Sequence, residues 1–157
     1  MKTALNVLLM TLFVLNVAYA GDLPDPKVTP GYLNPAVTQA TISKTICVSG
    51  YTATIRPTAS YTTKLKLKQL RAGPYKSDLG AASVEEDHLI SLEIGGHPTD
   101  ERNLWPQHWS EPMGAKQKDH LENTLKKMVC AKQITLADAQ HMISTDWVAA
   151  YKKLKVK

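Results

Sequence analysis

The sequence contains little phenylalanine and little cysteine, with one Phe and two Cys among 157 residues. Because Phe is so scarce, aliphatic side chains must supply most of the hydrophobic core. After residue 20 no segment approaches the roughly 20 apolar residues that span a bilayer, which excludes a membrane-spanning helix there. No internal repeat is evident. We therefore expect one compact, soluble domain.

The first 20 residues predict export. Lys2 precedes an apolar run at 4–17, and Ala18-Tyr19-Ala20 places small residues where a signal peptidase reads them. We expect cleavage after Ala20 and a periplasmic or secreted protein; the alternative is an uncleaved anchor. Residue 21 is Gly, so the new terminus has no Cys that could accept a lipid, and we expect no membrane anchor after cleavage.

The two cysteines, Cys47 and Cys130, lie in the predicted mature chain. In an oxidising compartment two thiols favour a disulfide over the alternative of two separate buried thiols. A bridge would close a loop of about 80 residues and stabilise the fold by roughly 4 kcal/mol in the chain-entropy model. It would also connect the segment before residue 86 to the end of a later helix.

Composition predicts one mature domain, which we expect to be a monomer. Cleavage of 20 of the 157 residues leaves about 137 residues, the usual size of one folded unit. We assign 21–37, rich in Pro, Asp and Gly, to an extended lead-in and 38–157 to the domain. Because Lys2 is the one charged residue in 1–20, removing it lowers the net charge from +5 to about +4. A mild positive charge favours a polyanionic partner.

The most informative stretch is Glu86 to Gly96, EDHLISLEIGG, which is followed by Asn103-Leu104-Trp105-Pro106. Phosphodiester hydrolysis at neutral pH needs a base that deprotonates water and a cation that neutralises the charge gathering on the phosphate. Asp87, His88 and Asn103 are residue types that provide both functions.

This pattern resembles the HNH, or ββα-metal, endonucleases, and it is most similar to small exported HNH-type proteins with a Lys-Asp-x-x-Glu helix. The resemblance implies an α+β fold with a ββα-metal core, to which we add N-terminal short strands, a C-terminal helix and one disulfide. It implies an endonuclease of low sequence specificity that acts on nucleic acid, DNA in preference to RNA. It also implies one divalent cation, Mg²⁺ first, with Mn²⁺ or another transition metal as alternatives.

The resemblance gives each motif residue a role. His88 takes the place of the general base, and an imidazole with a pKa near 6.5 is able to accept a proton at neutral pH. Asp87 takes the place of a metal ligand, and its carboxylate suits Mg²⁺. Asn103 either orients the histidine or completes the metal shell, and both roles stay open.

At the position where the family has its third metal ligand, this sequence has no residue that could serve as one. The family spacing falls near Pro112 and Met113, and neither side chain binds a hard cation. Asp119 and Glu122, on one face of the following helix, are the first choices. The other candidates are Lys118, His120 and Asn123 on that helix and His108 before it.

Two basic clusters flank the motif, and each is more typical of a solvated surface or tail than of a binding patch. The first cluster consists of Lys64, Lys66, Lys68 and Arg71, and the second of Lys152, Lys153, Lys155 and Lys157. The first cluster is the better candidate for contact with the nucleic-acid backbone.

Hydrophobic periodicity and turn residues predict the elements. We expect one or two short strands in 38–57, and either a strand or a helix capped by Thr62 or Thr63 in 61–70. For the motif we expect a strand at 88–94, a loop at 95–102 and a return strand at 103–105. Helices are expected at 115–130 and after Thr135, where Thr135-Leu136-Ala137-Asp138 has the pattern of a capping box.

A second hypothesis is an exported nucleic-acid or polyanion-binding protein that keeps the HNH fold without turnover. A third is a disulfide-bonded envelope protein in which the motif arises by chance.

Overall fold

The computed structural model describes residues 23–109 and 112–156. In this part the chain has a mixed α+β fold with one antiparallel sheet of two strands, β1 (Val84–His88) and β2 (Leu104–His108). The helices of the described part are α1 (Tyr51–Ile55), α2 (Ala59–Arg71), α3 (Ala115–Cys130) and α4 (Leu136–Lys153). Three short 3-10 turns accompany them: η1 (Ile42–Lys44), η2 (Leu92–Ile94) and η3 (Glu101–Asn103).

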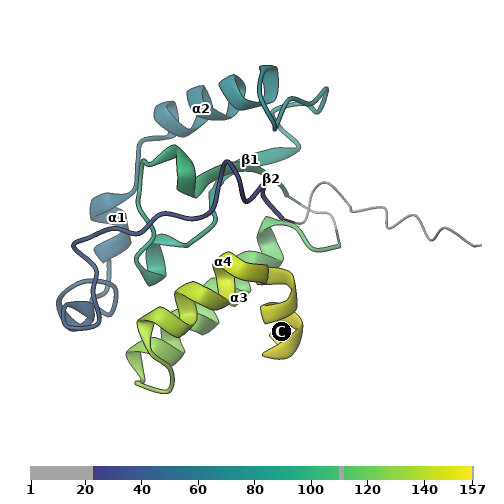
Figure 1. Cartoon of the computed structure of the whole chain (residues 1–157). Coiled ribbons are helices and arrows are strands. Elements are labelled where there is room, and N and C mark those ends of the chain that lie inside the picture. Colours follow the sequence, from purple (N-terminus) through teal and green to yellow (C-terminus); the bar gives the residue numbers. More distant parts are fainter. Residues whose placement is uncertain (1–22, 110–111, 157) are drawn as a thin grey trace, which may run out of the picture.

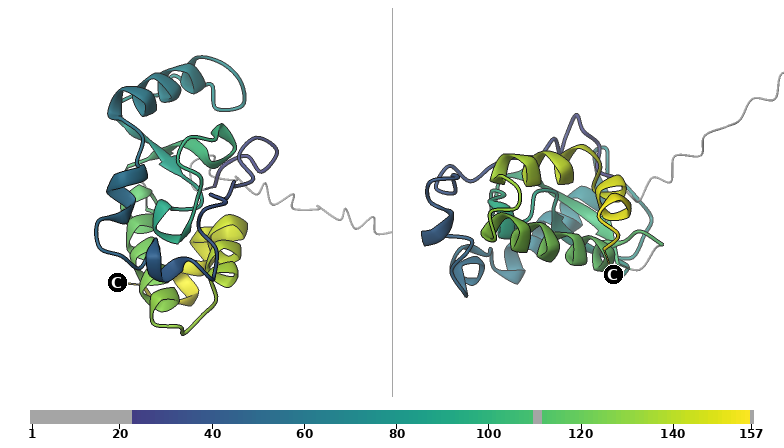
Figure 2. Two further views of the ribbon diagram at one scale, coloured as in Figure 1. Left: turned by 90° about the vertical axis from the view of Figure 1, so that its left-hand side faces the viewer. Right: turned by 90° about the horizontal axis from the view of Figure 1, so that it is seen from below.

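The sheet lies between α2 on one side and the antiparallel pair α3 and α4 on the other (Figure 1). The view turned by 90° about the vertical axis keeps this order, with α2 at one end of the molecule (Figure 2). The loop that follows β1 and contains η2 packs on α3 and α4. The end of β1 therefore lies close to α3.

Helices α3 and α4 form as predicted because their apolar residues repeat at helical spacing. Leu121, Leu125 and Val129 of α3 are fully buried, as expected for side chains four residues apart. Thr135 and Asp138 form the predicted capping box: each side chain accepts a hydrogen bond from the other residue's backbone N–H, both at 3.1 Å. This cap fixes the start of α4.

The predicted disulfide is confirmed. Cys47 and Cys130 are bonded, with 5.6 Å between their Cα atoms and a sequence separation of 83. The bridge joins the segment between η1 and α1 to the last residue of α3.

The strand predicted at 88–94 is wrong, because β1 ends at His88 instead of beginning there. After Leu89 the chain turns into η2, where the Ser91 hydroxyl accepts a hydrogen bond from the backbone N–H of Glu93 at 3.1 Å. Gly95 then closes the turn with a φ of +84°, a left-handed conformation that favours glycine. Buried apolar side chains in this segment therefore belong to a compact turn.

The return strand covers 104–108 rather than 103–105, and Pro106 lies within it, opposite Glu86. Proline is tolerated because β2 has a single neighbouring strand and needs no second ladder.

The strands predicted in 38–57 are also wrong, since this segment contains η1 and α1. Threonine hydroxyls here donate to nearby carbonyls: Thr45 to Thr41 at 2.8 Å and Thr54 to Tyr51 at 2.7 Å. Such local bonds give the backbone an alternative to a ladder. The ambiguous segment 61–70 is helical within α2, and the cap is Thr58, whose hydroxyl accepts from the Tyr61 N–H at 3.3 Å.

The predicted signal peptide at 1–20 lies outside the described residues. Among the helices of 23–109 and 112–156, none combines the length and apolar composition required to cross a membrane.

Candidate active-site cavity

The end of β1 borders a cavity of about 310 Å³, which brings part of the predicted site together. Asp87, His88, Asp119 and Glu122 all line it, while Asn103 does not. The other lining residues are Arg56, Glu85, Glu86, Ser91, Leu92 and Trp109.

His88 is held in one orientation by the backbone. Its Nε2 lies 2.9 Å from the Pro98 carbonyl oxygen, which accepts a hydrogen bond, so Nε2 carries the proton. In the neutral ring Nδ1 is then the basic nitrogen. The side chain is 6 % exposed, and burial lowers the pKa of His88 below 6.5 against the raising effects of Pro98 and Asp87. The ring is therefore neutral at pH 7 and able to accept a proton.

Asn103 is fully buried, and its side-chain amide forms hydrogen bonds with backbone groups. Its Nδ2 donates to the carbonyl oxygens of Ile90 at 2.9 Å and His97 at 3.1 Å. Its Oδ1 accepts from the N–H of Ile90 at 2.9 Å and of Tyr32 at 3.4 Å. Of the two predicted roles, this arrangement favours holding the loop that positions His88 over binding a metal ion.

Lys118 lies at the centre of the acidic residues and was one of the lesser candidates from the sequence. Its Nζ donates to Asp87 Oδ2 at 2.7 Å, to the backbone oxygen of His88 at 2.6 Å, and to Glu122 Oε1. The Lys118 side chain is 1 % exposed, and Asp87 and Glu122 are 13 % and 12 % exposed. The predicted ligands Asp87 and Glu122 therefore converge on an ammonium group.

Burial changes the protonation of the carboxyl groups along β1. It raises the pKa of Glu85 to about 8 and that of Glu86 to about 8, and in both cases the nearby Asp87 adds to the effect. Neither carboxyl oxygen of Glu86 has a hydrogen-bond partner among the described residues. Both residues are mostly protonated at pH 7, so the cavity is less negative than its five carboxyl groups suggest.

The carboxyls on α3 are also affected by burial. Burial raises the pKa of Glu122 to about 7, although Lys118 acts in the opposite direction. Partial burial, with a contribution from Asp87, raises the pKa of Asp119 as well.

The predicted Mg²⁺ ion stays a prediction, and the side chains predicted to bind it are not arranged to do so at the end of β1. Carboxylate oxygens are its preferred ligands, but Asp87 and Glu122 both bind the Lys118 ammonium. The oxygen of Asn103 accepts two backbone hydrogen bonds. In the described part of the chain no three His, Cys, Asp or Glu side chains are grouped to hold a metal ion.

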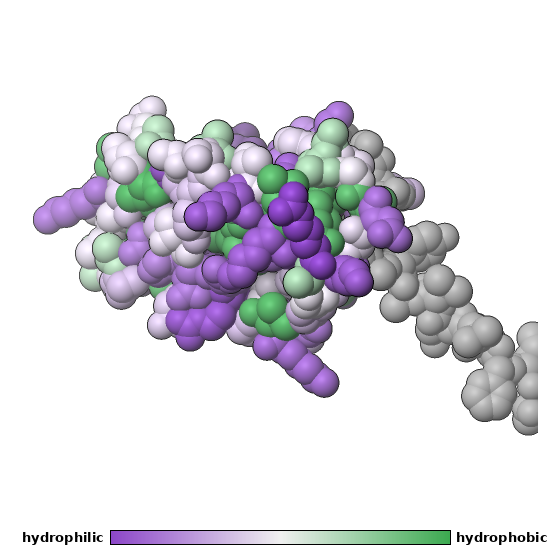
Figure 3. Space-filling view, turned by 90° about the horizontal axis from the view of Figure 1, so that it is seen from above, coloured by the Kyte–Doolittle hydropathy of each residue, from purple (hydrophilic) through white to green (hydrophobic). Residues whose placement is uncertain are grey.

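The predicted nucleic-acid contacts lie on α2 and have unequal surroundings. The face of the molecule that carries α2 mixes hydrophilic side chains with small apolar areas (Figure 3). Lys66 Nζ donates to the carbonyl oxygens of Ala81 at 2.8 Å and Val84 at 2.9 Å, so it braces the start of β1. Lys66 is thus the member of the cluster least able to reach a ligand.

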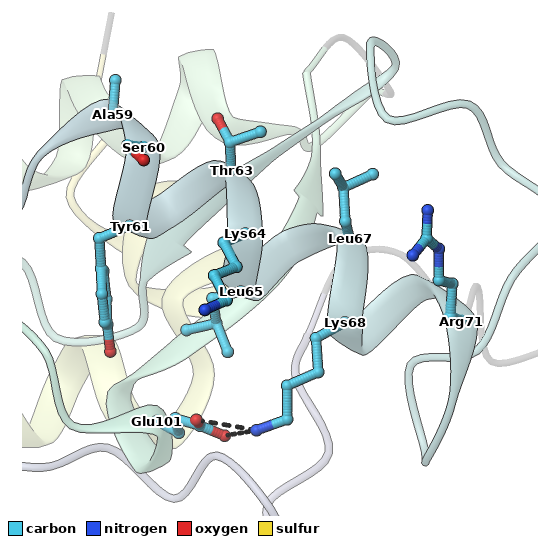
Figure 4. Close-up of a pocket in the computed structure, with 10 residues that line it drawn as sticks. All are labelled: Ala59, Ser60, Tyr61, Thr63, Lys64, Leu65, Leu67, Lys68, Arg71 and Glu101. Carbon is cyan, nitrogen blue, oxygen red and sulfur yellow. Dashed lines mark hydrogen bonds and ion pairs between the residues drawn. The ribbon is translucent and has the colours of Figure 1, made fainter.

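The other three members line a groove of about 890 Å³ along α2 (Figure 4). Lys68 forms an exposed ion pair with Glu101 at 2.9 Å, drawn dashed in Figure 4. Among the described residues Lys64 and Arg71 form no side-chain hydrogen bond or ion pair, which leaves them able to contact a polyanion.

Sequence reasoning did not identify Arg56 or Trp109 as parts of the cavity. Arg56 is the one cationic side chain among its ten lining residues. Trp109 is 38 % exposed at the cavity, whereas Trp105 is buried in the core. No pattern near Arg56 signals this role, because α1 reaches the cavity through tertiary packing. For Trp109 the available signal was its proximity to the motif.

Comparisons of the chain with protein-family models, curated proteins and solved structures give no significant match.

Proposed function

We propose that this chain is an HNH-type endonuclease that hydrolyses phosphodiester bonds of nucleic acid, DNA in preference to RNA. In this proposal β1, β2 and α3 form the ββα core of the family, and the site lies at the end of β1. The observation that supports it best is His88, a buried residue that lines the cavity and whose imidazole Nε2–H is bonded to a carbonyl. An enzyme that activates water needs a neutral, oriented base of this kind.

The proposed reaction is an in-line attack by water. The water oxygen bonds to phosphorus while the bond between phosphorus and the leaving sugar oxygen breaks. His88 accepts the water proton at Nδ1, and the leaving oxygen takes a proton from solvent. Asn103 acts as a positioning residue, because it fixes the loop that ends near the carbonyl to which His88 is bonded.

The substrate contacts follow from the lining residues. Arg56 is exposed, and its guanidinium suits two oxygens of one phosphate. Trp109 offers an exposed ring on which a base can stack. The predicted contacts on α2 would then hold the backbone outside the cavity. Export remains part of the proposal, and the Cys47–Cys130 disulfide supports an oxidising compartment.

The test is cleavage of plasmid DNA and structured RNA by the purified mature, oxidised protein. His88→Ala is expected to reduce the cleavage rate by about 10²- to 10⁴-fold, the usual loss when a general base is removed. His141→Ala is the matched control, because His141 is an exposed residue of α4 outside the cavity. A thermal melt of each variant confirms that the fold is kept.

Two results would contradict the proposal. Cleavage by His88→Ala at the native rate would remove His88 from the mechanism. Salt-sensitive binding of nucleic acid without any product would instead support the alternative, a binding protein that keeps the HNH fold without turnover.

A further inference from the structure

The ammonium group of Lys118 occupies the position between the carboxylates of the cavity. Its three acceptors are the side-chain oxygens of Asp87 and Glu122 and the backbone oxygen of His88. An ammonium group has three N–H donors, so all of them are used. Lys118 thus joins the last residue of β1 to helix α3 through one nitrogen atom.

The surroundings keep this lysine charged although its side chain is buried. Its side chain is 1 % exposed, and its Nζ forms ion pairs with both Asp87 and Glu122. A buried charge is tolerated when it is paired and fully hydrogen-bonded in this way.

A divalent cation at the same position would need the same oxygens. Hard cations bind carboxylate and carbonyl oxygens. Lys118 already donates hydrogen bonds to one of each on β1, the carboxylate of Asp87 and the backbone carbonyl of His88. The fixed positive charge would also repel a second cation placed within a few ångströms. Binding of a metal ion there would require Lys118 to leave a site in which it is almost fully enclosed.

We propose that the Lys118 ammonium is a built-in cation that takes the place of a divalent metal ion at the end of β1, so that the site works without one. Lys118 acts as a positioning residue: it orients Asp87 and holds His88 at the end of the strand. The part of this inference that concerns cleavage rests on the proposed function, whereas the part that concerns metal binding does not.

Metal binding tests the inference directly, with Mn²⁺ and electron paramagnetic resonance. The native, oxidised protein is expected to leave added Mn²⁺ free up to about 1 mM, the range of very weak binding. Lys118→Met keeps the length of the side chain and releases both carboxylates, so it is expected to bind Mn²⁺ at least about tenfold more tightly than the native protein.

Two further variants separate charge from packing. Lys118→Arg keeps the positive charge and is expected to bind no Mn²⁺. Lys126→Met is the matched control on the same helix, because Lys126 is partly exposed and pairs with Glu93 away from the cavity. It is expected to behave as the native protein does.

The EDTA measurement uses the native protein and does not depend on the folding of a variant, whereas Asp87→Asn locates any bound Mn²⁺ ion. Binding of one Mn²⁺ ion per native chain, lost in Asp87→Asn, would show that a metal ion displaces Lys118. Cleavage by the native protein is expected to persist in EDTA, and cleavage that EDTA abolishes and Mg²⁺ restores would overturn the inference as well. If no condition gives cleavage, the proposed function fails, and the Mn²⁺ measurement still decides the role of Lys118.

Discussion

Replacing Asn103 with Asp separates the two roles that its motif position allows. Aspartate is a better ligand for a hard cation than asparagine, so a metal-binding residue would tolerate the change. A residue that holds the loop would not, because aspartate loses the amide donors that reach the carbonyls of Ile90 and His97. The substitution keeps the size and shape of the side chain.

The magnitude follows from the two bonds that are lost. A buried acceptor left without its donor costs about 1–3 kcal/mol, so Asn103→Asp is expected to lower the free energy of unfolding by about 2–5 kcal/mol. For a domain of this size that corresponds to a fall of about 10 °C or more in Tm. A protonated aspartic acid can donate one bond, so the loss is expected to be smaller at acidic pH.

The assay is thermal and urea unfolding of the native protein and the variant at neutral and acidic pH. Asn123→Asp is the control, because Asn123 is exposed on α3 and donates a local bond to the Asp119 carbonyl at 2.8 Å. It is expected to change stability by less than about 0.5 kcal/mol. If Asn103→Asp is as stable as the native protein, the loop-holding role is refuted.

Three further predictions concern stability and binding. The pKa of Glu86, raised from 4.5 to about 8 by burial and Asp87, gives stability that is fully present below pH 4.5 and is lost as pH rises through 8. Above that pH, Glu86→Gln is therefore expected to have a free energy of unfolding roughly 1–3 kcal/mol higher than the native protein, measured by urea unfolding. The stability of the variant is also expected to depend less on pH. The double variant with Cys47→Ser and Cys130→Ser is expected to lose about 4 kcal/mol in urea unfolding, and an unchanged midpoint would show that the bridge contributes little. Trp109→Ala is expected to weaken the binding of single-stranded nucleic acid by about 1–3 kcal/mol, measured by titration at fixed salt concentration. Equal affinity of the variant and the native protein would exclude stacking on this ring.

The helices could be predicted from the sequence because their signals are local. The disulfide could be predicted because the chain has two cysteines and therefore one possible pairing. Leu121, Leu125 and Val129 repeat at helical spacing, and burial of that face is what forms α3. The capping box at Thr135 marks a helix start by bonds between residues three apart.

The turn after His88 was not accessible, because a distant residue determines it. Ile90 and its neighbours read as a buried strand, yet the backbone of Ile90 pairs with the side chain of Asn103 instead of with another strand. Periodicity cannot distinguish a short buried strand from a buried turn.

The surroundings of the site residues were equally hidden. Asp87, His88, Asp119 and Glu122 were predicted to lie together, and they do line one cavity. The partner that Asp87 takes depends on how far α3 reaches across the end of β1. Spacing shows that Lys118 and Glu122 share a helical face, but it does not show that this face is closed over by the strand.

The position of the disulfide has a consequence for the lifetime of the protein. Every residue that lines the cavity, from Arg56 to Glu122, lies between Cys47 and Cys130 in the sequence. The cavity is thus built within a single covalent ring. A protease that cuts the exposed loop between α2 and β1 would open this ring without releasing either piece. In surroundings rich in proteases, the two halves of a nicked chain would stay attached until a reductant cleaved the bridge.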